Sequence, residues 1–456
     1  MEVFKLKKSK LLALVLALSV MVFSFATAVS AEGAAVTLKQ GETTAEYETV
    51  AEAVADVAAD GEQATITLGG NFTGAGVKVV EGKNIVFDLG GYTWDITDTV
   101  GSTGTETNGL QLLKGATVTI KNGAMTSKTA KLLIQNYCTL TLDNVKLSGQ
   151  DNLTQLIVSS NNGSTTIKNG TEITAAAGGK AFDSDKWGSY DGGHVILEDG
   201  KITGDVNATN GGKMELNGGT IDGDVIASNY VSQGFENTAA QIVINGSTVE
   251  GDVKAEGKGE ITVAGGIVKG GVDSAGETDV KVTGGEFYGT LGEKADTADA
   301  EYMAQIKSGE QTKTVVGKTV FDSAVKNLKS GETISLLTVP ADTSITVADG
   351  VKVENKTEED VNVNDNVLEA GESIEIKDET SSGSSNESEN ESGSSSNTSS
   401  EENSSDNTGN VSDDTTEPDA DPQMGDNGSI MLWFAVAAGA LCLAGGMLAI
   451  KKKERE

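Results

Sequence analysis

The sequence has very little arginine, histidine, proline or cysteine for its length. Among 456 residues the only Arg is Arg455, the only His is His194, three residues are Pro and two are Cys. Cys138 lies in a Gly-rich region and Cys442 in an apolar run that we assign to a membrane, so no disulfide is expected between them. The fold must therefore be held by burial, and we expect Cys138 to be a small buried apolar side chain.

Basic residues are also scarce relative to acidic ones. The chain has 34 Lys and Arg against 68 Asp and Glu, a formal net charge of -34. A surface with this charge repels phosphate backbones, which argues against a nucleic acid partner. Gly is abundant instead, with 57 residues, well above an average share.

The N-terminal end has the pattern of an export signal. "MEVFKLKKSK" carries four Lys and precedes an apolar run that ends in small residues. This predicts a secretory signal peptide over residues 1–31, cleaved after Ala31. An uncleaved membrane helix is the alternative, because the run is about long enough to cross a bilayer.

The C-terminal end predicts attachment to the cell surface. Residues 377–428 are almost entirely Ser, Asn, Glu, Asp, Thr and Gly, a composition expected to form a disordered stalk. Residues 429–450 are uncharged and long enough to span a bilayer, and the basic tail 451–456 should stay in the cytoplasm. We therefore expect an exported protein held at the membrane or cell wall.

A motif just before this span resembles a cell-wall sorting signal. Both ends resemble those of Gram-positive surface proteins processed by sortase, whose pattern is Leu-Pro-x-Thr-Gly, an apolar span and a basic tail. In "DPQMG", Pro422, Gln423 and Gly425 match, whereas Asp421 replaces Leu and Met424 replaces Thr. The resemblance implies cleavage after Met424 and covalent linkage to peptidoglycan; without cleavage, the span would stay in the membrane.

Apolar residues recur with a period of 19 in the middle of the chain. The anchors are Leu197, Leu216, Ile244, Val263 and Val282, with steps of 19, 28, 19 and 19, and the long step contains the nine-residue insertion "NYVSQGFEN". Three short apolar segments per unit, separated by Gly-rich corners, are typical of one coil of a parallel β-helix. Two residues after each anchor stands Asn, Asp or Gly, which predicts a positive φ at that corner.

We therefore expect an all-β fold of about ten coils of ~19–20 residues, with helical units at both ends. Val50, Val54 and Val57 share one face of a predicted helix that Gly61 should end, and a similar phrase recurs at 321–337. From the N-terminus, the predicted segments are the signal peptide (1–31), an N-terminal cap (32–62), the β-helix (63–292), a small α+β unit (293–376), the stalk (377–428), the transmembrane segment (429–450) and the tail (451–456).

The layout over about residues 35–292 resembles the pectate-lyase-like right-handed β-helix of many bacterial surface proteins. That resemblance implies that an enzyme must be considered. Lyases with this fold use Asp-bound Ca²⁺ and a basic residue, usually Arg, while the related hydrolases use clustered Asp with Gly-His-Gly and Arg-x-Lys. The expected exported part has no Arg, and "GGHV" lacks the Gly after His194. We therefore predict no catalytic residues and expect His194 in a loop or at a strand edge.

Three carboxylates form a possible ladder. Asp205, Asp224 and Asp252 hold equivalent positions in successive coils, which stacking would place ~5 Å apart. Three alternatives are open: turn residues facing water, ligands of a divalent cation such as Ca²⁺, or a catalytic pair. No other cofactor is expected.

Two insertions, residues 181–194 and 229–237, carry aromatic residues beside acidic ones and should leave near the same edge about two coils apart. Aromatic rings with flanking carboxylates suit sugars or peptides, although the rings could also pack on the protein itself. The sequence thus favours a non-enzymatic surface protein, an adhesin or a glycan- or matrix-binding protein. The alternatives are a polysaccharide lyase or glycoside hydrolase and a structural cell-envelope element. The candidate ligand-binding residues are Phe182, Trp187, Tyr190, Tyr230 and Phe235.

Overall fold

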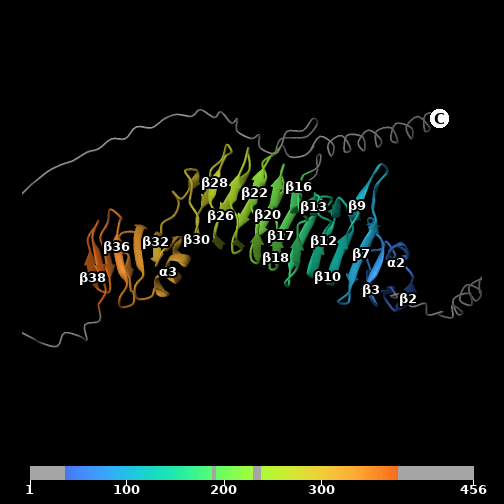
Figure 1. Ribbon diagram of the computed structural model, residues 1–456, viewed down its shortest axis with the longest axis horizontal. Coiled ribbons are helices and arrows are strands. Elements are labelled where there is room, and N and C mark those ends of the chain that lie inside the picture. Colours follow the sequence, from blue (N-terminus) through green and yellow to red (C-terminus); the bar gives the residue numbers. More distant parts are fainter. Residues whose placement is uncertain (1–35, 187–191, 230–237, 378–456) are drawn as a thin grey trace, which may run out of the picture.

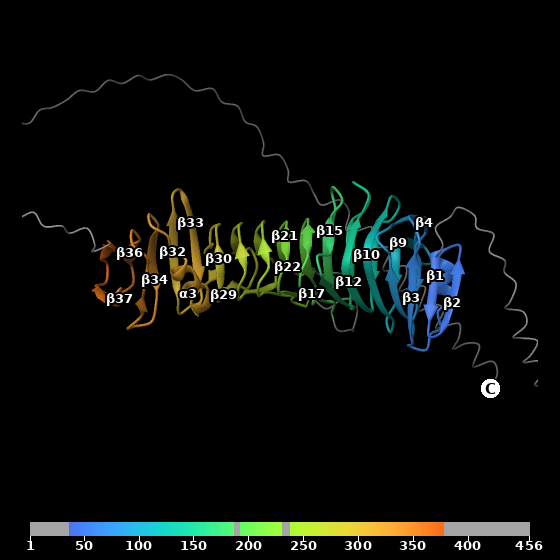
Figure 2. The same ribbon diagram turned by 90° about the horizontal axis from the view of Figure 1, so that it is seen from below.

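The computed structural model describes residues 36–186, 192–229 and 238–377 (Figure 1). The predicted signal peptide, stalk, sorting motif and transmembrane segment lie outside these residues. The described residues are mostly β, with 52% in strands and 5% in helices. Figures 1 and 2 show an elongated stack that runs from the N-terminal end to the C-terminal unit.

Successive turns of the chain lie in register on one another. Each strand pairs in parallel with the equivalent strand of the next turn, so that Leu197 lies opposite Leu216 and Val206 opposite Val225. Both steps are 19 residues, the period of the sequence. These long parallel sheets are compatible with a parallel β-helix.

Each coil except the last contributes one strand to each of three faces, and the last coil reaches the third face only through an isolated bridge between Leu291 and Val272. Face 1 is formed by β3 (Gln63–Leu68), β6 (Asn84–Asp88), β10 (Thr117–Ser127), β12 (Thr139–Ser148), β14 (Ser164–Lys168), β17 (His194–Leu197), β20 (Lys213–Leu216), β23 (Gln241–Ile244), β26 (Glu260–Val263) and β29 (Val280–Val282), and β31 (Ala295–Asp296) extends it. Face 2 is formed by β4 (Phe72–Ala75), β7 (Thr93–Asp98), the second halves of β10 and β12, β15 (Glu172–Thr174), β18 (Lys201–Thr203), β21 (Thr220–Asp222), β24 (Thr248–Val249), β27 (Ile267–Val268) and β30 (Gly285–Phe287).

Face 3 is a separate sheet. It consists of β5 (Val77–Val79), β9 (Thr105–Leu112), β11 (Leu132–Asn136), β13 (Leu156–Asn161), β16 (Lys180–Asp185), β19 (Val206–Thr209), β22 (Val225–Ser228), β25 (Val253–Ala255) and β28 (Val272–Ser274), with β8 (Val100–Ser102) antiparallel to β9. The ten face 1 strands from β3 to β29 agree with the expected number of coils.

The core runs along the inside of the stack. Along face 3, Val206, Val225 and Val253 occupy the same buried position in successive coils. Cys138 is buried as predicted, and this burial raises the pKa of its thiol to about 12. A thiol with so high a pKa is a poor nucleophile at neutral pH.

The corners follow two different rules. In the early coils Asn122 and Asn144 have φ of 57° and 52°, as predicted, and the Asn144 amide donates to Asn122 Oδ1 at 3.4 Å. At three later corners the prediction is wrong by one residue, because Gly219, Gly266 and Gly285 have the positive φ instead of the glycine before each. At the corner after Ile244 neither Gly246 nor Ser247 has a positive φ. Gly218 is needed for space instead, since a Cβ there would lie 2.3 Å from the Glu198 carbonyl oxygen of the coil beneath.

The helix α2 (Val50–Asp56) is shorter than expected. Thr49 accepts from the Glu52 amide and the Glu52 carboxylate accepts from the Thr49 amide, so a capping box starts the helix. Val57 is already extended, which ends the helix well before the predicted Gly61. The helix packs on β1 (Val36–Gln40), β2 (Thr43–Tyr47) and the strands of the first coil.

The C-terminal unit repeats the order of the N-terminal cap. A hairpin of β32 (Met303–Ser308) and β33 (Gln311–Val316) precedes α3 (Lys318–Lys326), and β34 (Thr333–Thr338) pairs antiparallel with β32, as β3 does with β1. β33 also pairs with β30, which joins the unit to the last coil. The remaining strands are β35 (Ser344–Ile345), β36 (Lys352–Asn355), β37 (Val361–Val363), β38 (Asn366–Leu368) and β39 (Ser373–Glu375).

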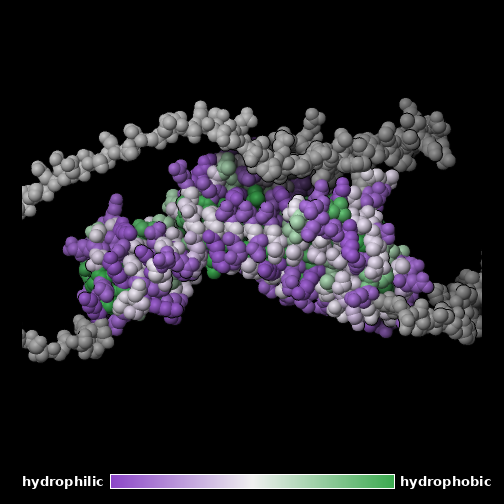
Figure 3. Space-filling view, in the orientation of Figure 1, coloured by the Kyte–Doolittle hydropathy of each residue, from purple (hydrophilic) through white to green (hydrophobic). Residues whose placement is uncertain are grey.

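Within the described ranges, neither helix is long and apolar enough to cross a bilayer. The face of the molecule seen in Figure 3 is mainly hydrophilic, with apolar residues scattered over it.

Candidate functional site

A row of polar side chains runs along the outside of face 3. In each of five successive strands, a polar residue alternates with inward-facing neighbours, as Gln111 does between the buried Leu110 and Leu112. Parallel pairing aligns the five positions on adjacent coils, ~4.8 Å apart. We call this set the outer polar row; its members are Gln111, Gln135, Ser159, Asp183 and Asn207. The row points away from the core, but its four uncharged side chains are buried, with exposed fractions of 3–5%.

Several oxygens at this row have no hydrogen-bond donor. Gln135 Oε1 accepts from Gln111 Nε2 at 3.1 Å and from Asn108 Nδ2 at 3.0 Å. Within the described part of the chain, Asn108 Oδ1, Gln111 Oε1 and Asn207 Oδ1 lack a partner although they are buried. A buried acceptor without a donor costs about 1–3 kcal/mol. A ligand could donate O–H or N–H groups to these oxygens only after the residues that cover them move aside, because Asn108, Gln111 and Asn207 are only 3–5% exposed.

Two carboxylates lie near the centre of the row. Asp183 and Asp185 are two residues apart on β16 and so project from the same side. Thr209 Oγ1 donates to Asp183 Oδ1 at 3.3 Å, and Asn161 Nδ2 donates to Asp185 Oδ2 at 3.5 Å. Burial raises the pKa of Asp183 to about 6, against the opposing effects of Lys180 and Thr209. Asp183 therefore titrates closer to neutrality than an ordinary carboxyl.

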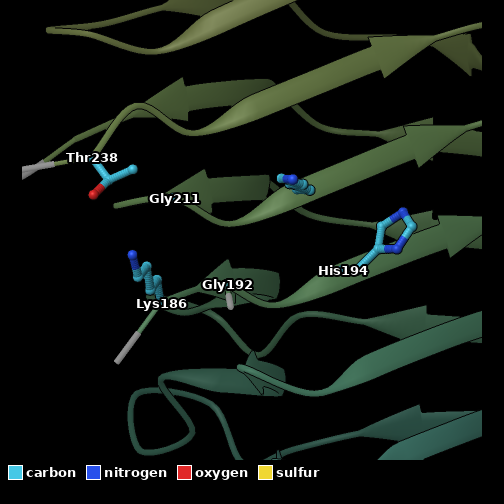
Figure 4. A pocket seen from close by; sticks show the side chains of 6 residues that line it. Lys186, Gly192, His194, Gly211 and Thr238 are labelled. Carbon is cyan, nitrogen blue, oxygen red and sulfur yellow. The ribbon is translucent and has the colours of Figure 1, made fainter. Parts of the chain in front are cut away.

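A pocket of about 360 Å³ lies at the edge of face 3 (Figure 4). At this edge β16, β19 and β22 turn into β17, β20 and β23 of the following coils. The prediction of an insertion over residues 181–194 is wrong in its first part, because residues 181–185 belong to β16. The segments that follow β16 and β22 begin at this edge with one coil between them, as the sequence indicated. We call it the corner pocket; it is lined by Lys186, Gly192, His194, Gly211, Lys213 and Thr238.

The corner pocket gathers basic groups. His194 opens β17, as expected for a strand-edge residue, and its Nε2 lies 3.0 Å from Glu215 Oε1. Lys213 opens β20 directly opposite His194, and its side chain is exposed. Figure 4 shows Lys186 and Thr238 near each other, with His194 at another side of the pocket.

The predicted aromatic site needs one correction. Phe182 is fully buried in β16, opposite Val158 and Val206, so its ring belongs to the core and cannot contact a ligand. Side chains alternate between the two sides of a strand, and Phe182 pairs with two buried valines, so its side chain also points inward. Trp187, Tyr190, Tyr230 and Phe235 lie outside the described residues, and their role stays a prediction.

The carboxylate ladder also has a structural role that the sequence did not reveal. Asp205 Oδ1 accepts from the Asp224 amide at 3.0 Å, and Asp224 Oδ1 accepts from the Asp252 amide at 2.8 Å. Asp252 Oδ1 accepts from the Gly271 amide at 2.8 Å, and the resulting hydrogen bond is the largest cause of its lowered pKa. Each carboxylate thus ties its coil to the next.

Lys254 takes the place assigned to a cation in this ladder. Its Nζ lies 2.8 Å from Asp224 Oδ2 and 3.0 Å from Asp252 Oδ2, which relieves the repulsion between the two carboxylates. This arrangement agrees with the first of the three alternatives, turn residues at the surface, and Ca²⁺ ligation by these three Asp stays an untested alternative. Across the described ranges, no group of three or more Asp, Glu, His or Cys is placed to hold a metal ion.

Sequence reasoning missed the outer polar row and the corner pocket. The row has a weak signal, a polar residue between two small or apolar ones, as in "LQL" and "VNA". The corner pocket has no signal in the sequence, because its residues Lys186 and Lys213 are 27 residues apart. In comparisons with known proteins, no family model, curated protein or solved structure matches the chain.

Proposed function

We propose that this protein is a non-enzymatic adhesin of the bacterial cell surface that binds an extracellular glycan along the outer polar row. The fold that would carry the site is a right-handed parallel β-helix, tethered through the predicted stalk and the residues 421–450. A protein of the host matrix is the related possible ligand, because its backbone N–H groups can donate to the same oxygens as sugar hydroxyls.

The observation that carries the proposal is the set of unpartnered acceptors at Asn108, Gln111 and Asn207. The proposal requires the residues that cover the row to move aside, because these side chains are 3–5% exposed; sugar hydroxyls could then donate to the oxygens and accept from the amide groups of the row. Five rungs span about 19 Å, which suits an oligosaccharide better than a single sugar. The scarcity of Arg argues against a lyase or hydrolase of the type that the fold resemblance suggests.

The test is a glycan array probed with the exported chain, residues 32–428. We expect binding of selected glycans, and Asn207→Ala and Gln111→Ala should each weaken it about threefold to tenfold, the loss of one hydrogen bond. Gln241→Ala is the matched control, because Gln241 lies on the outside of face 1 and bonds Glu260 instead. Unchanged affinity of both row variants would refute the site.

A glycoside hydrolase or polysaccharide lyase is the second candidate, and one observation favours it. Asp183 and Asp185 project from the same side of β16, and the raised pKa of Asp183, about 6, suits a general acid or base. Release of reducing or unsaturated sugars that Asp183→Asn abolishes would establish this function and refute the non-enzymatic one.

Surface anchoring is proposed from the ends of the sequence. If sortase cleaves after Met424, the protein resists detergent extraction but is released by wall-degrading enzymes. Extraction by detergent alone would instead indicate a membrane anchor through residues 429–450.

A further inference from the structure

A second pocket, of about 240 Å³, lies in the C-terminal unit beside α3 (Figure 1). It forms where the start of α3 and the residue before β32 meet the loop between β34 and β35. All of these segments fall within residues 238–377 of the described chain. We call it the α3 pocket; the lining residues that matter here are Tyr302, Lys318, Phe321, Asp322, Thr343 and Ser344.

One wall of the α3 pocket is aromatic. The Phe321 side chain is buried, and the half-buried Tyr302 ring packs on it, with 5.3 Å between the ring centroids and 50° between the ring planes. The Tyr302 carbonyl accepts from the Gly317 amide at 2.8 Å, which fixes Tyr302 to the start of α3. Tyr302 therefore presents a fixed apolar surface, which suits the C–H face of a sugar ring.

Beside this ring stand a hydrogen-bond donor and an acceptor. Lys318 Nζ lies 2.6 Å from Asp322 Oδ2 and 5.1 Å from the centroid of the Tyr302 ring. The two side chains of the ion pair are 61% and 55% exposed, so a ligand can reach them. An ammonium has three N–H donors and a carboxylate has two oxygens, so each group keeps capacity beyond the ion pair. The pair can therefore donate to one hydroxyl of a sugar and accept from the adjacent one.

The loop between β34 and β35 adds hydroxyl groups on a fixed backbone. Thr343 Oγ1 donates to the Pro340 carbonyl at 2.6 Å, and the Thr343 carbonyl accepts from the Asn362 amide at 2.9 Å. These bonds hold the loop to itself and to β37. The exposed Ser344 then opens β35, and its hydroxyl can donate to or accept from a ligand.

A neutral ligand fits this arrangement of charges better than an ion does. The Lys318 ammonium lies over the Tyr302 ring, the position that an external cation would need. The Asp322 carboxylate beside that ammonium would repel an external anion. A ring with several hydroxyls needs no net charge and uses both members of the ion pair.

We propose that the α3 pocket binds one neutral hexose, with its ring on Tyr302 and two adjacent hydroxyls on Lys318 and Asp322. A volume of about 240 Å³ is below the usual size of a pocket for a drug-sized molecule and suits a single sugar unit. The pocket lies on the C-terminal unit and the outer polar row on face 3, so this is a second glycan contact that does not depend on the row.

The experiment titrates the methyl glycosides of glucose, galactose and mannose into the exported chain, residues 32–428, and follows binding by saturation-transfer NMR. We expect at least one glycoside to bind with a dissociation constant on the order of 1 mM, as its small size allows. Asp322→Ala should weaken that binding about tenfold or more, because it removes a hydrogen bond to a charged group.

Asp299→Ala is the matched control. Asp299 also forms an exposed ion pair at 2.6 Å, with Lys281, and it is not one of the described residues that line the α3 pocket. If Asp322→Ala and Asp299→Ala have equal effects, or if none of the three glycosides binds, the pocket proposal is wrong. Binding of arginine amide in place of the glycosides would assign a cation to the pocket and would also overturn the proposal.

The outer polar row variant Asn207→Ala separates the two sites. If Asn207→Ala abolishes glycoside binding and Asp322→Ala does not, the sugar lies on the row, so the pocket proposal fails and the proposed function stands. If Asp322→Ala weakens glycoside binding but the row variants leave the glycan array unchanged, the row is refuted and the α3 pocket stands.

Discussion

The variant Phe182→Ala tests whether Phe182, the first aromatic residue of segment 181–194, stabilises the core or binds a ligand. The Phe182 side chain is fully buried, with Val158 and Val206 opposite it in the adjacent coils. Removing a buried Phe ring costs about 3–5 kcal/mol through lost burial and the cavity left behind. Coils contact mainly their neighbours, so the loss should fall on the coil of β16 and those beside it.

The assay is equilibrium unfolding in guanidinium chloride, followed by far-ultraviolet circular dichroism, with hydrogen exchange to locate the weakened coils. Phe182→Leu is the control that keeps most of the volume, and it should lose about 1.5 kcal/mol or less. Glycan binding of the folded fraction should be retained in both variants. The core assignment would be overturned if Phe182→Ala lost less than about 1 kcal/mol but abolished binding.

Four further outcomes follow from the contacts. Gly218→Ala should destabilise the stack by about 1–3 kcal/mol, because its Cβ would meet the Glu198 oxygen at 2.3 Å; a melting temperature equal to wild type would contradict this packing. Burial raises the pKa of Asp183 to about 6, so the folded state binds this proton more tightly than the unfolded state does. The free energy of unfolding should therefore fall as the pH rises from about 4 to about 6. Asp183→Asn should remove that fall in urea unfolding measured over a pH series. Lys254→Met should lower the free energy of unfolding by about 1 kcal/mol or less, because its ion pairs with Asp224 and Asp252 are partly exposed. Added Ca²⁺ should leave the melting temperature of the wild type unchanged, and a Ca²⁺-dependent rise would favour the alternative that these Asp residues bind the ion. Thr49→Ala should lower the free energy of unfolding by about 1 kcal/mol, because it removes the capping box of α2. If the α2 amides were protected from hydrogen exchange as well in the variant as in the wild type, this prediction would be wrong.

The sequence by itself determined the stack. A period of 19 between Leu197 and Leu216, with three apolar segments per period, requires strands that turn every few residues and pair with their copies one coil on. The burial of Cys138 and the positive φ of Asn122 and Asn144 were also predictable, because each depends on the residue type and on its neighbours along the chain.

Only the tertiary structure decided which side of each strand faces the interior and which groups meet at the corners. The step from Ser164 to His194 is 30 residues, not 19, so the period could not fix the parity of Phe182. Lys254 contacts Asp224 at a separation of 30 residues, and His194 meets Lys213 in the adjacent coil. Side-chain contacts between coils depend on how each turn is aligned over the one beneath, and extra residues at the corners change that alignment without altering the repeat.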